Sequence, residues 1–442
     1  ALSTAAIVAI ETTDISGLST AAVAALNTAQ IAVLTTEQLG VLTTAQVRAL
    51  ETRDVAVLTT EQVVALTSTQ LGALTTAQIG ALNTAAIVAI ETTDISGLST
   101  AAVAALTTTQ VGVLTTEQVV ALTSSQIGAL KTSQVGALTT AQVVAIETGD
   151  LTALNTAAVA ALTTAAVAAL TTEQIGVLKT SQIAALETRD VAVLTTDQVT
   201  ALTSSQLGAL TTAQIGALST AAIVAIETTD ISGLSTAAVA ALNTAQIAVL
   251  TTEQLGVLTT AQVRALETRD VAVLTTEQVV ALTSTQLGAL TTAQIGALNT
   301  AAIVAIETTD ISGLSTAAVA ALTTTQVGVL TTEQVVALTS SQIGALKTSQ
   351  VGALTTAQVV AIETGDLTAL NTAAVAALTT AAVAALTTEQ IGVLKTSQIA
   401  ALETRDVAVL TTDQVTALTS SQLGALTTAQ IGALSTAAIV AI

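Results

Sequence analysis

The chain repeats one eight-residue pattern without interruption, from Ala1-Leu2-Ser3-Thr4 to the final Ala441-Ile442. Each octad reads Ala or Val, Leu or Ile, a polar residue, Thr or Ser, a variable residue, Gln, Asp or Ala, then Val, Ile or Leu, and a mostly small residue. A strict short period without insertions is typical of solenoids and fibres, in which each repeat contacts mainly its neighbours. The pattern therefore constrains the architecture far more than it constrains any activity.

A longer repeat lies over the octads. Residues 217–432 repeat residues 1–216 letter for letter, and residues 433–442 begin a third copy. These 216 residues form twenty-seven octads, so the octad register survives the duplication. We therefore expect residues 1–442 to form one continuous octapeptide-repeat solenoid segment. Because the chain lacks an initiator Met and both ends fall inside the repeat, we also expect it to be a fragment of a longer chain.

Three kinds of secondary structure could carry an eight-residue period. A continuous α-helix is excluded because eight residues at about 100° each leave a drift of about 80° per octad, which winds the apolar residues around the helix. A β-solenoid is an alternative because Thr, Val and Ile favour strands. However, the two main apolar positions are five residues apart and would point to opposite faces of one strand.

The third reading is a string of very short helices, which the segment Leu58–Val63 illustrates. Thr59 can be the N-cap, and Gln62 stands at the third helical position, as a capping box requires. Leu58 and Val63 are placed as a hydrophobic staple. Where Glu or Lys takes the third octad position, as at Lys131, we expect the threonine that follows to be the cap instead.

A helix of about six residues is unstable alone, because nucleation costs more than so few hydrogen bonds return. The sequence therefore predicts an all-α repeat fold, a thin α-solenoid with one very short helix per octad and with Leu and Val inside. We favour three octads, or 24 residues, per coil, because twenty-seven octads divide by three and not by two. Two octads per coil and a β-solenoid remain alternatives.

The composition excludes several functions. The chain has no Cys, His, Trp, Tyr, Phe, Met or Pro, so the usual catalytic base and thiol nucleophile are missing and we expect no enzyme. The net charge of -20 would repel nucleic acids and anionic lipid surfaces. No apolar run reaches the roughly 18 residues that span a bilayer. We therefore expect no nucleic acid, no membrane insertion and no small-molecule substrate, and the chain itself as partner, through coil-to-coil stacking and lateral association.

The most distinctive local pattern is Glu-Thr-x-Asp, in which two carboxylates three residues apart could share a calcium ion with backbone carbonyls and water. Solvated cap residues are the alternative reading. We therefore expect no cofactor, with calcium as the one alternative. In the octads with Arg53 and Arg189, local charge compensation is the simpler account. The candidate calcium ligands in the first long repeat are Glu11, Asp14, Glu51, Asp54, Glu91, Asp94, Glu147, Asp150, Glu187 and Asp190.

The Ala-Leu-Thr-Thr-x-Gln-Val tracts, which cover the entire chain, resemble those of very large repetitive bacterial proteins described as adhesin-like or secreted. The resemblance implies an extracellular or cell-surface setting. We therefore expect a structural protein that forms a filament or fibre by stacking of solenoid coils. A passive stalk or spacer of a giant adhesin is the alternative. A threonine-rich surface that binds ice, or an acidic one that binds calcium, is a third class.

Overall fold

The computed structural model describes residues 2–442 and is entirely helical over that range, with 55 helices and no strand. The helices contain four to six residues each, as in α2 (Thr12–Ile15) and α9 (Ser68–Ala73). One helix falls in each octad, so the prediction of a string of very short helices is confirmed. The absence of strands in residues 2–442 excludes the β-solenoid.

The chain divides into two compact units, Ala1–Ile226 and Glu227–Ile442. The second unit begins at the counterpart of Glu11, 216 residues later in the sequence.

The helices of the first unit are α1 (Thr4–Val8), α2 (Thr12–Ile15), α3 (Thr20–Ala24), α4 (Thr28–Ile31), α5 (Thr36–Gly40), α6 (Thr44–Ala49), α7 (Thr52–Val55), α8 (Thr60–Val64), α9 (Ser68–Ala73), α10 (Thr76–Ala81), α11 (Thr84–Ala89), α12 (Thr92–Ile95), α13 (Thr100–Ala105), α14 (Thr108–Gly112), α15 (Thr116–Val120), α16 (Ser124–Gly128), α17 (Thr132–Val135), α18 (Thr140–Ala145), α19 (Thr148–Leu151), α20 (Thr156–Ala160), α21 (Thr164–Ala169), α22 (Thr172–Val177), α23 (Thr180–Ala185), α24 (Thr188–Val191), α25 (Thr196–Thr200), α26 (Ser204–Ala209), α27 (Thr212–Ala217) and α28 (Thr220–Ala225).

The helices of the second unit are α29 (Thr228–Ile231), α30 (Thr236–Ala240), α31 (Thr244–Ala248), α32 (Thr252–Gly256), α33 (Thr260–Ala265), α34 (Thr268–Val271), α35 (Thr276–Val280), α36 (Ser284–Ala289), α37 (Thr292–Ala297), α38 (Thr300–Ala305), α39 (Thr308–Ile311), α40 (Thr316–Ala321), α41 (Thr324–Gly328), α42 (Thr332–Ala337), α43 (Ser340–Gly344), α44 (Thr348–Val351), α45 (Thr356–Ala361), α46 (Thr364–Leu367), α47 (Thr372–Ala376), α48 (Thr380–Ala385), α49 (Thr388–Val393), α50 (Thr396–Ala401), α51 (Thr404–Val407), α52 (Thr412–Thr416), α53 (Ser420–Leu423), α54 (Thr428–Ala433) and α55 (Thr436–Ala441).

The helix starts follow the capping box that the sequence predicts. In α8 the Thr59 hydroxyl accepts the backbone N–H of Gln62 at 3.2 Å, and the Gln62 side chain accepts the backbone N–H of Thr59 at 3.0 Å. Leu58 and Val63, which flank this start, are both buried. One octad thus contains a complete N-terminus, with its exposed N–H groups satisfied locally.

The octads with Glu or Lys at the third position start in the same register, so the prediction of a shifted cap is wrong. Lys131 and Glu11 are the N-caps of α17 and α2, and neither side chain makes a capping bond. In α17 the Gln134 side chain still accepts the Lys131 backbone N–H at 2.7 Å. The hydrogen bond of the capping box that Gln134 makes is therefore present. Burial of Leu130 and Val135 keeps the start of α17 at the same position in the octad.

Helices three apart in the sequence stack on one another in both units. For example, α5 packs against α2 and α8, and α6 packs against α3 and α9. Three octads therefore complete one turn of the solenoid, which confirms the predicted coil and excludes two octads per coil. The apolar positions point inward, as Val63 and Leu66 show with 0% and 2% of their surface exposed.

Small residues let neighbouring turns approach closely. A side chain at Gly72 in α9 would meet the Gly97 carbonyl oxygen at 2.5 Å, and one at Gly97 would meet the Ser68 backbone oxygen at 2.8 Å. Both contacts are closer than real Cβ atoms tolerate, so glycine is required at this approach of α9 to the end of α12.

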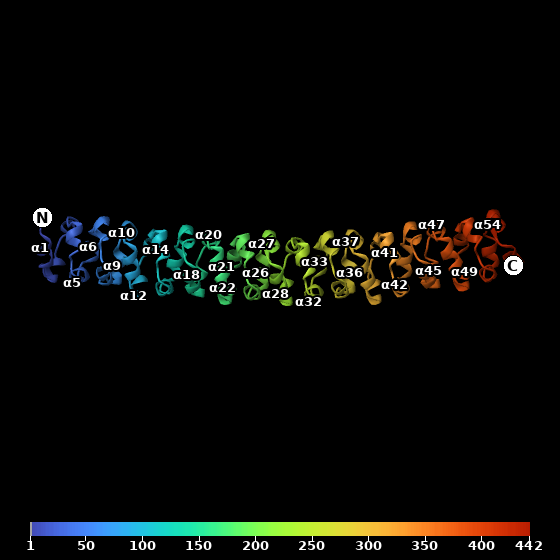
Figure 1. The fold of residues 1–442 in the computed structure, drawn as a ribbon, viewed down its shortest axis with the longest axis horizontal. Coiled ribbons are helices and arrows are strands. Elements are labelled where there is room, and N and C mark those ends of the chain that lie inside the picture. The colour runs from blue at the N-terminus through green and yellow to red at the C-terminus, as the bar shows by residue number, and fades with distance from the viewer. Residues whose placement is uncertain (1) are drawn as a thin grey trace. The chain divides into compact units, whose positions relative to one another are not determined.

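The stacks of helices wind as they run along the first unit (Figure 1). The helices α10, α13, α16, α19 and α22 pack successively on one another, yet α10 lies at the upper edge of the view and α22 at the lower edge. A helix therefore shares its side of the solenoid with helices of other stacks. Within residues 2–442, no helix is both long and apolar enough to cross a membrane.

Candidate functional site

The points where one helix ends and the next begins carry nearly all of the polar chemistry of the solenoid. We call a helix start with Gln at its third helical position a glutamine corner. It runs from the N-cap to this Gln, as in Thr67–Gln70. We call a Glu-Thr-x-Asp octad, such as Glu91–Asp94, an aspartate corner. Each corner lies against the corner of the preceding turn, and the two kinds use hydrogen bonds differently.

The glutamine corner joins two turns through one side chain. The Gln70 oxygen accepts the Thr67 backbone N–H at 2.8 Å. The Gln70 amide nitrogen donates to the backbone oxygens of Leu39 and Leu42, 31 and 28 residues earlier, at 2.9 and 2.7 Å. The Leu39 carbonyl lies in the last turn of α5 and also accepts the Leu42 N–H at 3.1 Å, and the Leu42 carbonyl follows the end of the helix. Gln70 is buried, so both functions operate away from bulk water.

The same bonds recur along both units, as Gln38, Gln78, Gln142, Gln334 and Gln358 show. Where alanine replaces the glutamine, the N-cap can take over its role as donor. Asn83, the N-cap of α11, donates from Nδ2 to the carbonyl oxygens of Ala56 and Leu58, both at 3.3 Å.

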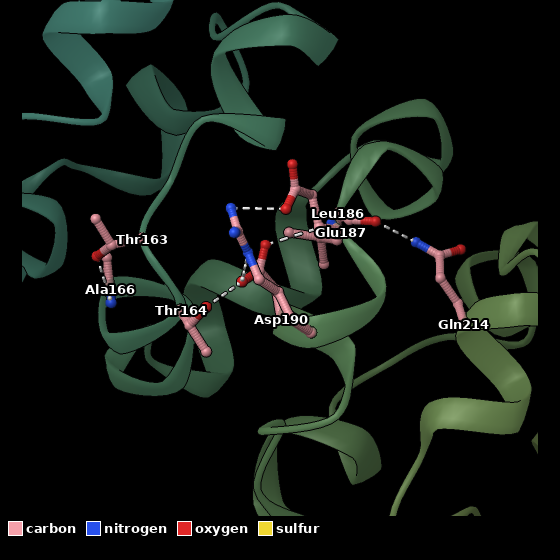
Figure 2. Close-up of polar contacts among 8 residues, drawn as sticks. Thr163, Thr164, Ala166, Leu186, Glu187, Asp190 and Gln214 are labelled. Atoms are coloured by element: carbon pink, nitrogen blue, oxygen red, sulfur yellow. Dashed lines mark hydrogen bonds and ion pairs between the residues drawn. The ribbon is translucent and has the colours of Figure 1, made fainter.

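The carboxylate side chain of the aspartate corner has no N–H group, so it can only accept hydrogen bonds. The Asp190 carboxylate accepts a hydrogen bond from the Thr164 hydroxyl, 26 residues earlier, at 2.7 Å. Ser68 and Ser124 donate in the same way to Asp94 and Asp150. Figure 2 shows both kinds of contact at one place, where Thr164 donates to Asp190 and Gln214 of the following turn donates to the Leu186 carbonyl at 2.7 Å.

Arginine completes the aspartate corners of α7 and α24. Arg189 contacts the Glu187 carboxylate at 2.6 Å and the Asp190 carboxylate at 3.8 Å (Figure 2). Arg53 makes the same pair of contacts with Glu51 and Asp54, at 2.5 and 4.0 Å. The predicted local charge compensation is therefore confirmed. The arginine is mostly exposed, whereas the Asp54 and Asp190 side chains are fully buried.

Two buried aspartates differ from the others. Asp54 has no hydrogen-bond partner for either carboxylate oxygen in the described structure, although Thr28 stands 26 residues earlier, at the position of a donor. Burial raises the pKa of Asp54, and Arg53 opposes this effect. The counterpart Asp270 also has a raised pKa, again because burial disfavours the ionised form.

The glutamates at the second helical position behave in the opposite way. The pKa of Glu37 and of Glu61 is lowered, chiefly because each carboxylate accepts its own backbone N–H, and the neighbouring threonine hydroxyls add to the effect. This is the favourable place for a negative charge at a helix start.

The structure does not gather the candidate calcium ligands into clusters. Residues 2–442 contain no group of three or more Asp, Glu, His or Cys side chains that could hold a metal ion. The N-cap glutamates Glu11, Glu51, Glu91, Glu147 and Glu187 are exposed. Of the aspartates, Asp14 is exposed, Asp94, Asp150 and Asp190 accept a hydroxyl from the preceding turn, and Asp54 lies beside Arg53. Calcium binding at these octads stays a prediction.

Sequence reasoning missed the second function of glutamine. The capping box accounts for the side-chain oxygen, but the bonds from the amide nitrogen depend on the register between turns. One signal was present in the sequence. A capping box can be completed by glutamate as well as by glutamine, yet glutamate never occupies the third helical position. The absence of glutamate indicates that the amide nitrogen of glutamine has a role of its own.

The fold and its corners define a helical-repeat solenoid whose turns are joined through buried side chains. The chain belongs to the ALTTAQ repeat family, whose sequence profile matches residues 7–44, 47–84, 87–124, 143–180, 183–220, 223–260, 263–300, 303–340, 336–361, 359–396 and 399–436. Ten of these matches begin four residues before the glutamate of an aspartate corner, so each of these family units contains one such corner near its start. A comparison with curated proteins found no match.

Proposed function

We propose that this chain is part of a structural protein that forms an extracellular or cell-surface filament by stacking of its solenoid turns. The single observation that carries the proposal is the glutamine corner. Its donors lie in one turn and its acceptors in the preceding turn, so the contact that holds a turn within the chain could also join turns of two chains.

The distribution of polar groups supports a structural role. The buried polar side chains of residues 2–442 are glutamines and aspartates of the corners, and most of them are used in capping and turn-to-turn contacts, with Asp54 as an exception. The chain has no His, Cys or Tyr, and its hydroxyls stand mainly at caps and first helical positions. An enzymatic role has no support in this arrangement.

The proposed partner is a second copy of the chain. The net charge of -20 disfavours nucleic acid and anionic membranes. Aromatic residues, which are common at the centres of protein–protein interfaces, are absent. Association is therefore expected to use repeated contacts of modest strength, as stacked turns provide. The extracellular or cell-surface location rests on the resemblance of the repeat to those of large bacterial surface proteins.

Electron microscopy of the purified protein tests the proposal. Filaments of constant width that are much longer than one chain are expected. Discrete particles whose length grows with the number of octads, and which do not join, would contradict the filament and support a stalk or spacer. A parallel sample with a calcium chelator tests the aspartate corners, since loss of filaments on chelation would give calcium a bridging role.

A further inference from the structure

The winding of the stacks gives the first unit two sides with different chemistry. In Figure 1, α5, α12 and α22 lie along the lower edge of this unit, and α10, α20 and α27 lie along its upper edge. Helices that share an edge are seven or ten octads apart in both sets. The position of a helix in the sequence therefore decides the side on which its exposed residues lie.

The acids that have no arginine beside them fall on one side. The helices that carry them are α2, α5, α8, α12, α15, α19, α22 and α25. Among these, α5, α12 and α22 form the lower edge, and the others pack directly on them: α2 and α8 on α5, α15 on α12, α19 and α25 on α22. We call this the acidic side. Such helices recur after three or four octads, which is about once per turn.

The basic residues of the first long repeat, apart from Arg48, fall on the other side. Arg48 is in α6, which lies between the two edges of the view. Arg53 is in α7, which packs on α10, and Arg189 is in α24, which packs on α27. Lys131 and Lys179 are the N-caps of α17 and α23, which both pack on α20. We call this the basic side.

The aspartate corners follow the same division. Those of α2, α12 and α19 lie on the acidic side and lack arginine, whereas those of α7 and α24 lie on the basic side and contain it. Where successive aspartate corners are five octads apart, the second corner lies on the other side. The corners of α12 and α19 are seven octads apart and lie on the same side. The sequence thus places arginine where the winding of the solenoid brings an aspartate corner to the basic side.

The helix ends on the two sides carry exposed valines or small residues. The acidic helices α5, α8, α15 and α22 each expose one valine, and these valines, Val41, Val64, Val120 and Val177, have 40 to 45% of their surface exposed. At the corresponding ends of the basic helices α6, α17 and α23 stand Ala49, Gly136-Ala137 and Ala184-Ala185. Val57 and Val193 are the exposed valines of the basic side. On the acidic side, Gly17, Gly97 and Ala153 follow α2, α12 and α19, so exposed valines and small residues occur on both sides.

The second unit repeats the division within itself. Its helices α32 and α42 carry acids and lie at the lower edge in Figure 1. Its helices α37, α47 and α54 lie at the upper edge, where α34 packs on α37, α44 and α50 on α47, and α51 on α54. These packed helices carry or follow the counterparts of the basic residues, Arg269, Lys347, Lys395 and Arg405.

We propose that chains associate side by side, with the acidic side of a unit in one copy against the basic side of a unit in a second copy. This inference rests on the proposed structural function and adds how its filaments are joined laterally. Two acidic sides repel each other, whereas an acidic side that faces a basic side meets the lysines, since Arg53 and Arg189 are already paired with their own glutamates.

Such a contact is heterologous, because it joins two different surfaces of identical chains. Each chain keeps one free acidic side and one free basic side after pairing, so further copies can add in the same way. The expected product is an open row of laterally associated chains, not a closed pair.

Cysteine cross-linking tests the orientation, and the absence of native cysteine makes each introduced thiol unique. Ala77→Cys in α10 marks the basic side, and Ala141→Cys in α18, which packs on the acidic helix α15, marks the other side. Both alanines are exposed and stand at the second helical position. A flexible bis-maleimide linker should join the two variants to each other in an equal mixture much more than it joins either variant to itself. Preferential self-linking of either variant, or no linking, would overturn the proposal.

Charge variants provide a second readout by sedimentation. Replacing the lysines by Gln should weaken lateral association at least tenfold at low salt. The matched control adds four acids to the acidic side and makes the same change in net charge, so it should leave association unchanged or stronger. Equal weakening by both variants would show general charge repulsion and overturn the proposal. The lysine variant changes Lys131, Lys179, Lys347 and Lys395 to Gln, and the control changes Thr93, Ala141, Thr309 and Ala357 to Glu.

Electron microscopy separates this inference from the proposed function. Single filaments that remain unpaired, with negative cross-linking, would overturn the lateral contact and leave the filament standing. Absence of any filament would overturn the proposed function itself.

Discussion

The glutamine and aspartate corners occupy the same place in the octad, but they join the turns in opposite directions. Gln70 donates from its own turn to the Leu39 and Leu42 carbonyls of the preceding turn. Asp94 accepts from Ser68, so there the donor lies in the preceding turn. The glutamine corner satisfies backbone groups of both turns, whereas the aspartate corner uses a side-chain hydroxyl and leaves the backbone carbonyls without that amide.

This difference shows that the two corners do not contribute equally to stability. A buried amide that completes several hydrogen bonds stabilises the contact, while a buried carboxylate requires donors or a counter-charge to offset its desolvation. Aspartate corners are accordingly the places where the solenoid depends on neighbouring residues such as Thr164 and Arg189. We expect them to open more readily than glutamine corners, and four substitutions or conditions test this.

The largest effect is expected from a charge in the apolar interior. A buried charge should destabilise glutamine and aspartate corners alike, so the difference in stability between them would disappear. Val63→Asp in a glutamine corner and Val55→Asp in an aspartate corner both place a carboxylate at a fully buried position. Each should cost more than about 3 kcal/mol and unfold the adjacent turns. Hydrogen exchange measured by mass spectrometry would report the loss of protection. Val64→Asp is the control, because Val64 is 43% exposed and should tolerate the change.

Removing the amide should convert a strong corner into a weak one. Gln70→Ala leaves the Leu39 and Leu42 carbonyls without their side-chain donor, at a cost of about 1–3 kcal/mol in local stability. The double variant Thr67→Asn with Gln70→Ala reproduces the arrangement of Asn83 and should recover part of that loss. Thermal unfolding and local hydrogen exchange are the measurements. A single variant as stable as the original chain would show that the turn-to-turn bonds contribute little.

The reverse exchange should strengthen a weak corner. Asp54 is buried without a hydrogen-bond partner, so Asp54→Gln removes a buried charge and supplies an N–H for the preceding turn. We expect α7 to become more stable by about 1–2 kcal/mol. Asp190→Gln is the comparison, because Asp190 already accepts from Thr164 and should gain less. Slower hydrogen exchange in α7 than in the unchanged chain would confirm the effect, and faster exchange would contradict it.

The smallest effect is expected from pH. The raised pKa of Asp54 means that the folded state binds its proton more tightly than the unfolded chain, so α7 should gain stability as the pH falls through the folded pKa toward the ordinary value of 3.8. The lowered pKa of Glu37 has the opposite sign. Its stabilisation of α5 is complete above the ordinary value of 4.5 and is lost as the pH falls through the folded pKa.

Hydrogen exchange of α5 and α7 as a function of pH, corrected for the intrinsic rate, would separate the two responses. Asp54→Asn should abolish the pH response of α7, and Glu37→Gln that of α5. A loss of protection in α7 on mild acidification of the unchanged chain would contradict the assigned direction.

Much of this fold follows from local chemistry. The Thr59 cap, the Gln62 capping box and the apolar spacing of Leu58 and Val63 predict the helix, its start and its buried face. The prediction of a shifted cap failed at Lys131 because burial of the apolar residues and the Gln134 oxygen fix the helix start even without a capping side chain. Local preference is thus overridden by the stacking register.

The corner contacts could not be predicted, because they join residues 26 to 31 positions apart, as in the pairs Thr164–Asp190 and Leu39–Gln70. Their identity depends on how far one turn is offset from the next, and the octad pattern does not give this offset. The same holds for the two sides. Counting acids along the sequence reveals a recurrence of three and four octads, but only the winding of the stacks shows that these helices face the same way.

The hydrogen bonds of the glutamine side chains also give the solenoid a direction. Each of these amides that we have described points toward the earlier part of the chain, whether in Gln38, Gln70 or Gln214. A transverse break between turns would therefore expose amide donors on one surface and carbonyl acceptors on the other. A polymer grown by such contacts has unlike ends, as cytoskeletal filaments do, and would elongate at different rates at the two ends. A capping molecule that offers only acceptors would stop growth at one end and leave the other active.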